Sequence, residues 1–208
     1  MDEFSRFVAA WNSFGAACSD TVAPEATYQA WFAHFLMEQF GVLQVVREVD
    51  FGSRHLDPDD QKRFTGHNLM LDIMILREPI VDLPRRATLG PAHSDVAPNR
   101  RSGLGRLKQF AIISELKVGS SQSLGLGYRE VVRDFHKLDA ILRAAQRDYP
   151  GNPAPFAVMC ILDNNEDHRL NRTHLGNLLT KSSIRSSIHP LICPATPELE
   201  WTIEQPTN

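Results

Sequence analysis

The stretch ISELKVGS, residues 113–120, places Glu115 and Lys117 two positions apart in an otherwise apolar run. Side chains alternate between the two faces of a β-strand, so both residues should point to one face and Leu116 to the other. Burying a carboxylate and an ammonium costs several kcal/mol unless each is paired or bound to a metal. The pattern therefore indicates either an ion pair at a sheet end or residues that carry out chemistry.

Two further carboxylates lie in apolar segments upstream. Asp72 interrupts NLMLDIMIL (68–76), a run typical of a strand buried on both faces. Glu25 lies seven residues before Phe32 in an amphipathic segment, which returns it to the inward face. Each has a structural explanation alone, as a hydrogen-bonded Asp or as an acid favoured by a helix N-terminus. Together, converging carboxylates repel one another unless a divalent cation neutralises them, and oxygen ligands favour Mg²⁺ or Mn²⁺.

The surrounding segments alternate between helical and strand patterns. Helical periodicity predicts helices over about 2–17, 24–40, 127–148 and 168–180. Apolar runs predict strands over 42–51, 68–76, 110–118 and 156–164. The first two or three strands suit a meander, and the last strand–helix–strand unit suits a parallel crossover. We therefore expect an α/β fold with a mixed central sheet of about four strands flanked by helices.

The order Glu25, Asp72 and Glu115-Leu116-Lys117 resembles the PD-(D/E)xK nuclease superfamily, which includes many restriction endonucleases, resolvases and repair nucleases. That family has a helix bearing an acid, a meander carrying the Asp and then ExK, a crossover helix and a further strand. One departure is Leu71, where the family often has Pro. The resemblance implies a restriction endonuclease-like core over about 21–165, within a single domain spanning 1–208.

The resemblance also implies roles for these residues. Mg²⁺ (or Mn²⁺) would be held by Asp72, Glu115, the main-chain carbonyl of Leu116 and Glu25. Lys117 would act on the attacking water or on the developing negative charge. A lysine near several carboxylates stays protonated, so charge stabilisation is the expected role.

The crossover helix carries further polar residues. By the same resemblance, Gln122 and Arg129, which flank the start of this helix, are candidate nucleic-acid contacts. Lys137 and His136 lie further along the helix, and we expect them on its solvated face.

A basic insertion occupies residues 78–108, ahead of a C-terminal extension over about 166–208. The formal net charge of the chain is −3, but from Leu83 to Lys108 six basic residues face one acidic residue, a local charge of +5. A solvated Arg-rich loop and a contact with a polyanion both explain this excess. Under the second interpretation, the candidate nucleic-acid-binding residues of the insertion are Arg100, Arg101, Arg106 and Lys108.

The composition argues against some locations. No apolar run approaches roughly 18 residues, so no membrane contact is expected. The N-terminus lacks the features of a signal peptide, and the three cysteines form no CxxC, so reduced thiols in the cytoplasm are expected.

The expected function is a metal-dependent nuclease, an endonuclease of a defence or repair type. The family's habits favour DNA over RNA, and a homodimer would place two sites to cut both strands of a duplex. The alternative is a nuclease-like module that binds nucleic acid or protein without turnover.

Overall fold

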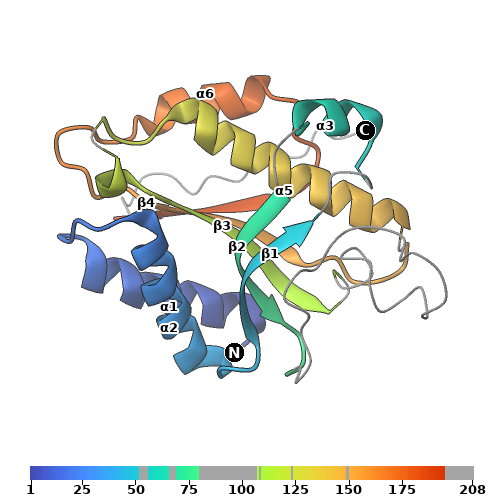
Figure 1. The fold of residues 1–208 in the computed structure, drawn as a ribbon, viewed down its shortest axis with the longest axis horizontal. Coiled ribbons are helices and arrows are strands. Elements are labelled where there is room, and N and C mark those ends of the chain that lie inside the picture. The colour runs from blue at the N-terminus through green and yellow to red at the C-terminus, as the bar shows by residue number, and fades with distance from the viewer. Residues whose placement is uncertain are drawn as a thin grey trace.

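The computed structural model describes residues 1–51, 56–65, 69–79, 107, 109–122, 124–148 and 150–194. Within these residues, five strands form one mixed sheet in the order β1-β2-β3-β4-β5, with helices on both faces (Figure 1). The α/β class and the mixed, helix-flanked sheet are therefore confirmed. The expected number of about four strands was wrong, because a fifth strand follows in the C-terminal part of the chain.

The sheet combines a meander with two parallel additions. The meander consists of β1 (Val45–Phe51), β2 (Leu69–Leu76) and β3 (Phe110–Val118). In it, β2 pairs antiparallel with β1 on one side and with β3 on the other. β4 (Phe156–Leu162) pairs parallel to β3, and β5 (Ile188–Cys193) pairs parallel to β4. The predicted meander and the predicted parallel crossover between β3 and β4 are both confirmed.

The two edge strands of the sheet, β1 and β5, each contain an irregular residue. β5 contains Pro190, which has no amide hydrogen to donate and is tolerated in sheets chiefly on edge strands. This proline is why the segment did not read as a strand in the sequence. β1 contains Glu48, whose φ of 53° lies in the left-handed region that side chains rarely adopt.

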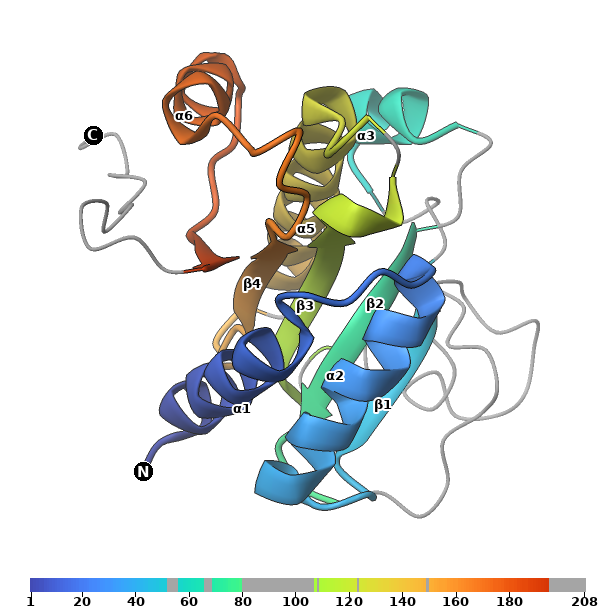
Figure 2. The same cartoon turned by 90° about the vertical axis from the view of Figure 1, so that its left-hand side faces the viewer.

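The helices form one layer on each face of the sheet. α1 (Glu3–Cys18) and α2 (Glu25–Phe40) cover one face, whereas α5 (Tyr128–Asp148) and α6 (Arg172–Lys181) lie on the other, with α3 (Pro58–Arg63) beside α5 (Figures 1 and 2). A short 3₁₀ turn, Gly119–Ser121, follows β3. Gly41 ends α2 with a φ of 83°, and its backbone N–H donates to the carbonyl of Met37. None of the helices in the described ranges is long and apolar enough to cross a membrane.

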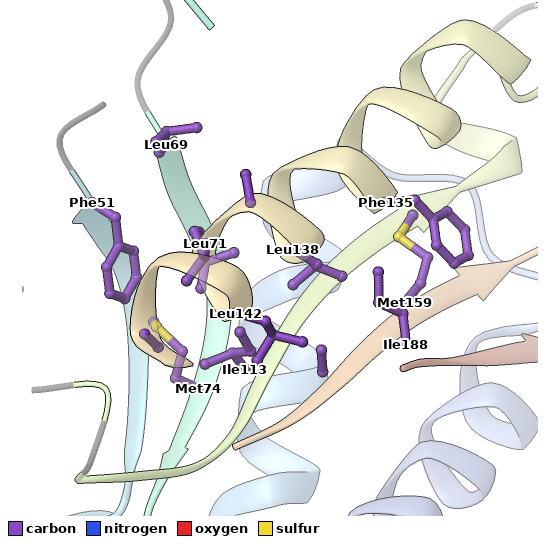
Figure 3. Close-up of a cluster of buried hydrophobic side chains, with 14 of the residues drawn as sticks. Phe51, Leu69, Leu71, Met74, Ile113, Phe135, Leu138, Leu142, Met159 and Ile188 are labelled. Carbon is purple, nitrogen blue, oxygen red and sulfur yellow. The ribbon is translucent and has the colours of Figure 1, made fainter. Parts of the chain in front are cut away.

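Apolar side chains on the two faces of the sheet form two cores. Leu71 and Ile113 of the sheet pack with Phe135 and Leu138 of α5 (Figure 3). On the other face, side chains of the sheet pack against aromatic residues of α1 and α2, and the cluster includes Ile112, Leu116, Val118, Phe7, Trp11, Phe14, Tyr28 and Phe32. Each large buried side chain contributes roughly 1.5–3 kcal/mol, so the two layers fix β3 rigidly between them.

Candidate functional site

β2 and β3 cease to pair where each carries an acidic residue. The paired register ends with Ile73 opposite Ser114, so Asp72 and Glu115 occupy the opposing positions just beyond it. The Asp72 carboxylate accepts a hydrogen bond of 2.8 Å from the amide of Leu116. The amide and carbonyl of one strand residue point to the same edge, so the Leu116 carbonyl also faces β2. The Leu116 carbonyl and the Asp72 carboxylate therefore lie on facing edges of the two strands.

The crossover helix α5 adds a lysine to this place. The Lys137 ammonium lies 2.6 Å from Oε2 of Glu115 and 3.5 Å from Oδ1 of Asp134, and it donates a 2.9 Å hydrogen bond to the Met70 carbonyl. The Lys137 side chain is only 12% exposed, so the expectation that it lies on a solvated face was wrong. His136 is half-buried, with its Nδ1 2.7 Å from a guanidinium nitrogen of Arg63.

Lys117 of β3 joins Glu25 of α2 to Asp134 of α5. Its ammonium donates a hydrogen bond of 3.1 Å to Oε1 of Glu25 and lies 3.3 Å from Oδ2 of Asp134. Glu25 lies in the first turn of α2 and faces inward, with 27% of its side chain exposed. Asp134 thus lies between the two lysines, and the charges alternate in sign from Glu25 to Glu115.

Burial and excess negative charge shift the ionisation of the strand acids. The pKa of Glu115 is raised well above its usual value, first by burial and then by the nearby Asp72 carboxylate. Burial also raises the pKa of Asp72, although the Leu116 amide opposes the shift. The pKa of Glu25 is likewise raised by burial, against the effect of Lys117. Without additional positive charge nearby, the ionised form of each of these carboxyl groups is disfavoured relative to its neutral form.

The two lysines respond in the opposite sense. Burial alone would lower the pKa of each, but the surrounding carboxylates outweigh burial and raise both values. For Lys117 the largest opposing contribution comes from Asp134, and for Lys137 it comes from Glu115. Both side chains are therefore ammonium ions throughout the neutral pH range.

The site carries an excess of negative charge and of buried acceptors. Its four carboxylates (Glu25, Asp72, Glu115 and Asp134) face two ammonium ions, which gives a formal charge of −2. Within the described residues, Oε1 of Glu115 and Oδ2 of Asp134 are buried without a hydrogen-bond partner. The latter atom is close enough to Lys117 for an ion pair but is not aligned for a hydrogen bond. One divalent cation would neutralise the formal charge.

The residues fit Mg²⁺ or Mn²⁺ in donor type and in charge. All candidate ligands are oxygen atoms, which hard divalent cations prefer. Oε1 of the Glu115 carboxylate has no hydrogen-bond partner among the described residues and is available as a ligand. Over the ranges that the structure describes, no three His, Cys, Asp or Glu side chains are grouped closely enough to hold a metal ion together. In this arrangement Lys137 is the cation beside Glu115.

A polar cleft lies at the carboxyl ends of β3 and β4, next to the loop that follows Lys117. Its volume is about 510 Å³, and it is lined by residues that include Ser120, Gln122 and Asn164. The Ser120 hydroxyl lies 2.8 Å from the Tyr28 hydroxyl. Tyr28 follows Glu25 in α2 by about one helical turn. Ligands of α/β proteins commonly bind at the carboxyl ends of parallel strands, so this cleft is well placed to receive one.

The predicted nucleic-acid contacts lie away from the charged cluster or outside the described residues. Gln122 lines the cleft, and its amide donates a 3.3 Å hydrogen bond to Glu130. Arg129 is exposed in the first turn of α5. The remaining candidates lie outside the described residues: Arg100, Arg101, Arg106 and Lys108.

Sequence reasoning missed Asp134 and Lys137, although one signal was present. Asp134 lies three residues after Val131 and four before Leu138, so it occupies a position on the apolar stripe of α5. A charged residue on that stripe must be buried and paired. Its partner Lys137 lies one helical turn further on, where i,i+3 neighbours meet.

Comparisons of this chain with protein-family models, with curated proteins and with solved structures found no match.

Proposed function

We propose that this chain is a metal-dependent nuclease with a restriction endonuclease-like core, and that it hydrolyses phosphodiester bonds in DNA. One observation carries the proposal: a buried cluster with a formal charge of −2, two of whose carboxylate oxygens have no hydrogen-bond partner among the described residues, lies where β2 and β3 separate. Structural ion-pair clusters do not need surplus buried charge, whereas a site for a divalent cation does. The chain order of acid-bearing helix, meander, crossover helix and parallel strand supports the same family.

Asp72, Glu115 and the carbonyl of Leu116 would hold Mg²⁺, because they bring oxygen ligands from two adjacent strands to one point. When bound there, the ion would polarise the scissile phosphate and lower the pKa of a coordinated water. The two strand acids would stay ionised in that state, because the added positive charge offsets the burial that raises their pKa values in the metal-free protein.

Lys117 is suited to stabilise negative charge on the phosphate. Its hydrogen bond to Glu25 and its ion pair with Asp134 fix its position, and N–H donors of the ammonium remain for a substrate oxygen. A positioned cation of this kind favours the transition state of phosphoryl transfer, and removing a comparable donor costs about 10²–10³ in turnover. In the described structure Glu25 contacts Lys117, which gives Glu25 a positioning role besides the metal-binding role that the family resemblance implies.

DNA is the proposed substrate on the strength of the family resemblance and of the local charge of +5 from Leu83 to Lys108. Phosphate contacts from such a segment would add affinity that is independent of sequence and sensitive to salt. A homodimer acting in the cytoplasm remains part of the proposal, since two sites would cut both strands of a duplex.

The alternative function is nucleic-acid or protein binding without turnover. The observation that favours it is the short ion pair between Lys137 and Glu115, which leaves no three carboxylates grouped for a metal within the described residues. If that ion pair persists when a divalent cation is present, the site cannot be completed and the chain would only bind.

Incubation of plasmid DNA with the protein tests the two functions. Cleavage is expected with Mg²⁺ or Mn²⁺ and not with EDTA, and Asp72→Asn and Glu115→Gln should each lower the rate by roughly 10³-fold or more. Asp59→Asn is the matched control, because the Asp59 side chain is 98% exposed on α3. Retention of DNA by a wild-type protein that never cuts it would establish the alternative.

A further inference from the structure

Three oxygen atoms surround the ammonium group of Lys137. Its three N–H donors face three oxygens, on Glu115, Asp134 and the main chain of Met70. The side chain of Lys137 is 12% exposed and the side chain of Glu115 is 2% exposed, so the 2.6 Å ion pair between them is shielded from water. Lys137 is therefore the cation that holds the most deeply buried acid of the site in the metal-free protein.

This ion pair differs from one that only stabilises the fold. A structural pair normally satisfies both partners, yet Oε1 of Glu115 has no hydrogen-bond partner within the described residues. Even with the positive charge of Lys137 included, the cluster keeps a formal charge of −2. Lys137 thus occupies one oxygen of a carboxylate that has capacity for a second cation.

Asp134 gives the ammonium of Lys137 a second anion in the same place. Its Oδ1 lies 3.5 Å from the Lys137 ammonium, longer than the 2.6 Å contact with Glu115. A short rotation of the flexible lysine side chain would exchange the close partner for the distant one while the Met70 carbonyl stays within reach. Glu115 can therefore be released without leaving a buried ammonium unpaired.

We propose that Lys137 is a positioning residue that takes the place of the divalent cation at Glu115 and moves to Asp134 when that cation binds. The inference rests on the proposed function, since it concerns the same carboxylates. Metal and ammonium compete for one carboxylate, so Lys137 weakens metal binding while it stabilises the metal-free protein. Its removal should change these two properties in opposite directions, whereas loss of a merely structural lysine would weaken both.

The variant Lys137→Met keeps the length and the apolar stem of the side chain and removes its charge. In calorimetric titration with Mn²⁺, we expect the dissociation constant of the variant to fall roughly tenfold or more below that of the wild type. In EDTA the variant should unfold at a lower temperature than the wild type, and Mn²⁺ should raise its unfolding temperature by more. Lys62→Met is the matched control, because the Lys62 side chain is 81% exposed, and it should behave as the wild type does.

The results separate the two proposals. A wild-type protein that takes up no divalent cation would overturn the proposed nuclease function. A wild type that binds Mn²⁺ beside a Lys137→Met protein that binds it equally or more weakly would overturn the role of Lys137 alone.

A measurement on the wild type covers the case in which Lys137→Met does not fold. The nitrogen signal of the Lys137 ammonium in isotope-labelled protein, assigned with Lys137→Arg, should shift when Mg²⁺ is added, because its closest partner changes. A signal that stays unchanged at saturating Mg²⁺ would show that the ion pair with Glu115 persists and would overturn the inference.

Discussion

Each half of α5 carries buried charges, and the two halves differ in how fully these charges are paired. In the second half, Arg143 binds three carboxylates, those of Asp57, Asp60 and Asp139, at 2.7, 2.5 and 3.0 Å. This group, the Arg143 network, ties α5 to α3. In the first half, Asp134 and Lys137 belong to the candidate site, where the acids outnumber the bases.

The difference is clearest between Asp139 and Glu115, which are each 1% exposed. Asp139 accepts hydrogen bonds from the amides of Arg185 and Ser186 and from Arg143. Burial alone would raise the pKa of Asp139, but these hydrogen bonds outweigh it and lower the pKa. Glu115 has a raised pKa, and one of its oxygens has no hydrogen-bond partner in the part of the chain that the structure describes. Burial of a carboxylate thus stabilises the fold at one end of the helix and costs stability at the other, as expected where function requires spare charge.

Breaking the Arg143 network should have the largest effect. Asp139→Ala removes an acceptor for two backbone amides and a partner of Arg143, so the free energy of unfolding should fall by roughly 3–5 kcal/mol. Urea denaturation at about pH 7 measures this loss. Asp148→Ala, at an exposed position of the same helix, should stay within about 1 kcal/mol of the wild type. A loss below about 1 kcal/mol for Asp139→Ala would contradict the stabilising role of the network.

The next effect concerns catalysis. Glu25→Gln should lower turnover by about 10–100-fold, less than loss of either strand acid, because Glu25 acts through its contact with Lys117. Steady-state kinetics on a fluorescent duplex would show a fall in kcat with little change in KM. A loss of kcat as large as that of Glu115→Gln would instead indicate that Glu25 binds the metal as directly as Glu115 does.

A smaller effect has the opposite sign to that of Asp139→Ala. Asp72→Asn keeps an oxygen to accept from the Leu116 amide and removes one charge from the cluster, so the metal-free protein should gain roughly 0.5–2 kcal/mol of stability. Thermal unfolding in EDTA measures the gain. A variant less stable than the wild type would mean that the charge of Asp72 is fully compensated, as that of Asp139 is.

The smallest effect is a pH dependence that separates the two regions. Glu115 has a raised pKa in the folded state, so its penalty is full above that pKa and is relieved as pH falls toward the unfolded value of about 4.3. The stability advantage of Glu115→Gln over the wild type in EDTA should therefore shrink from about pH 7 to about pH 5. The contribution of Asp139, whose pKa is lowered, should persist over this range and be lost only as pH falls below about 4. An advantage for Glu115→Gln that grows on acidification would show that the Glu115 pKa is not raised.

Much of the fold was readable because its segments have strong local patterns. β3 begins and ends at the predicted residues, and α5 starts within one residue of its expected boundary, since apolar residues recur along the whole length of both. β5 was not readable, because its side chains match no clear period and Pro190 argues against a strand unless the neighbouring strands are already known. Its place follows from tertiary pairing with β4.

The candidate site divides along a similar line. Glu115 and Lys117 can be identified from the sequence, because charged residues are rare in a buried strand. Lys137 does not, because a lysine on an amphipathic helix is ordinarily solvated, and only the approach of α5 to Glu115 reveals its contact. Local sequence reports the cost of burying a charge, whereas the identity of its partner depends on how distant segments pack.

The irregular residues at the two edges of the sheet have a consequence for behaviour at high concentration. An edge strand presents unpaired amides and carbonyls to which the edge of another copy can add, and such addition leads to aggregation. Pro190 removes one donor from β5, and the left-handed backbone at Glu48 interrupts the regular spacing of β1. Both edges of this sheet are thereby protected against edge-to-edge polymerisation, so copies of the chain should associate through side-chain surfaces rather than by extending the sheet.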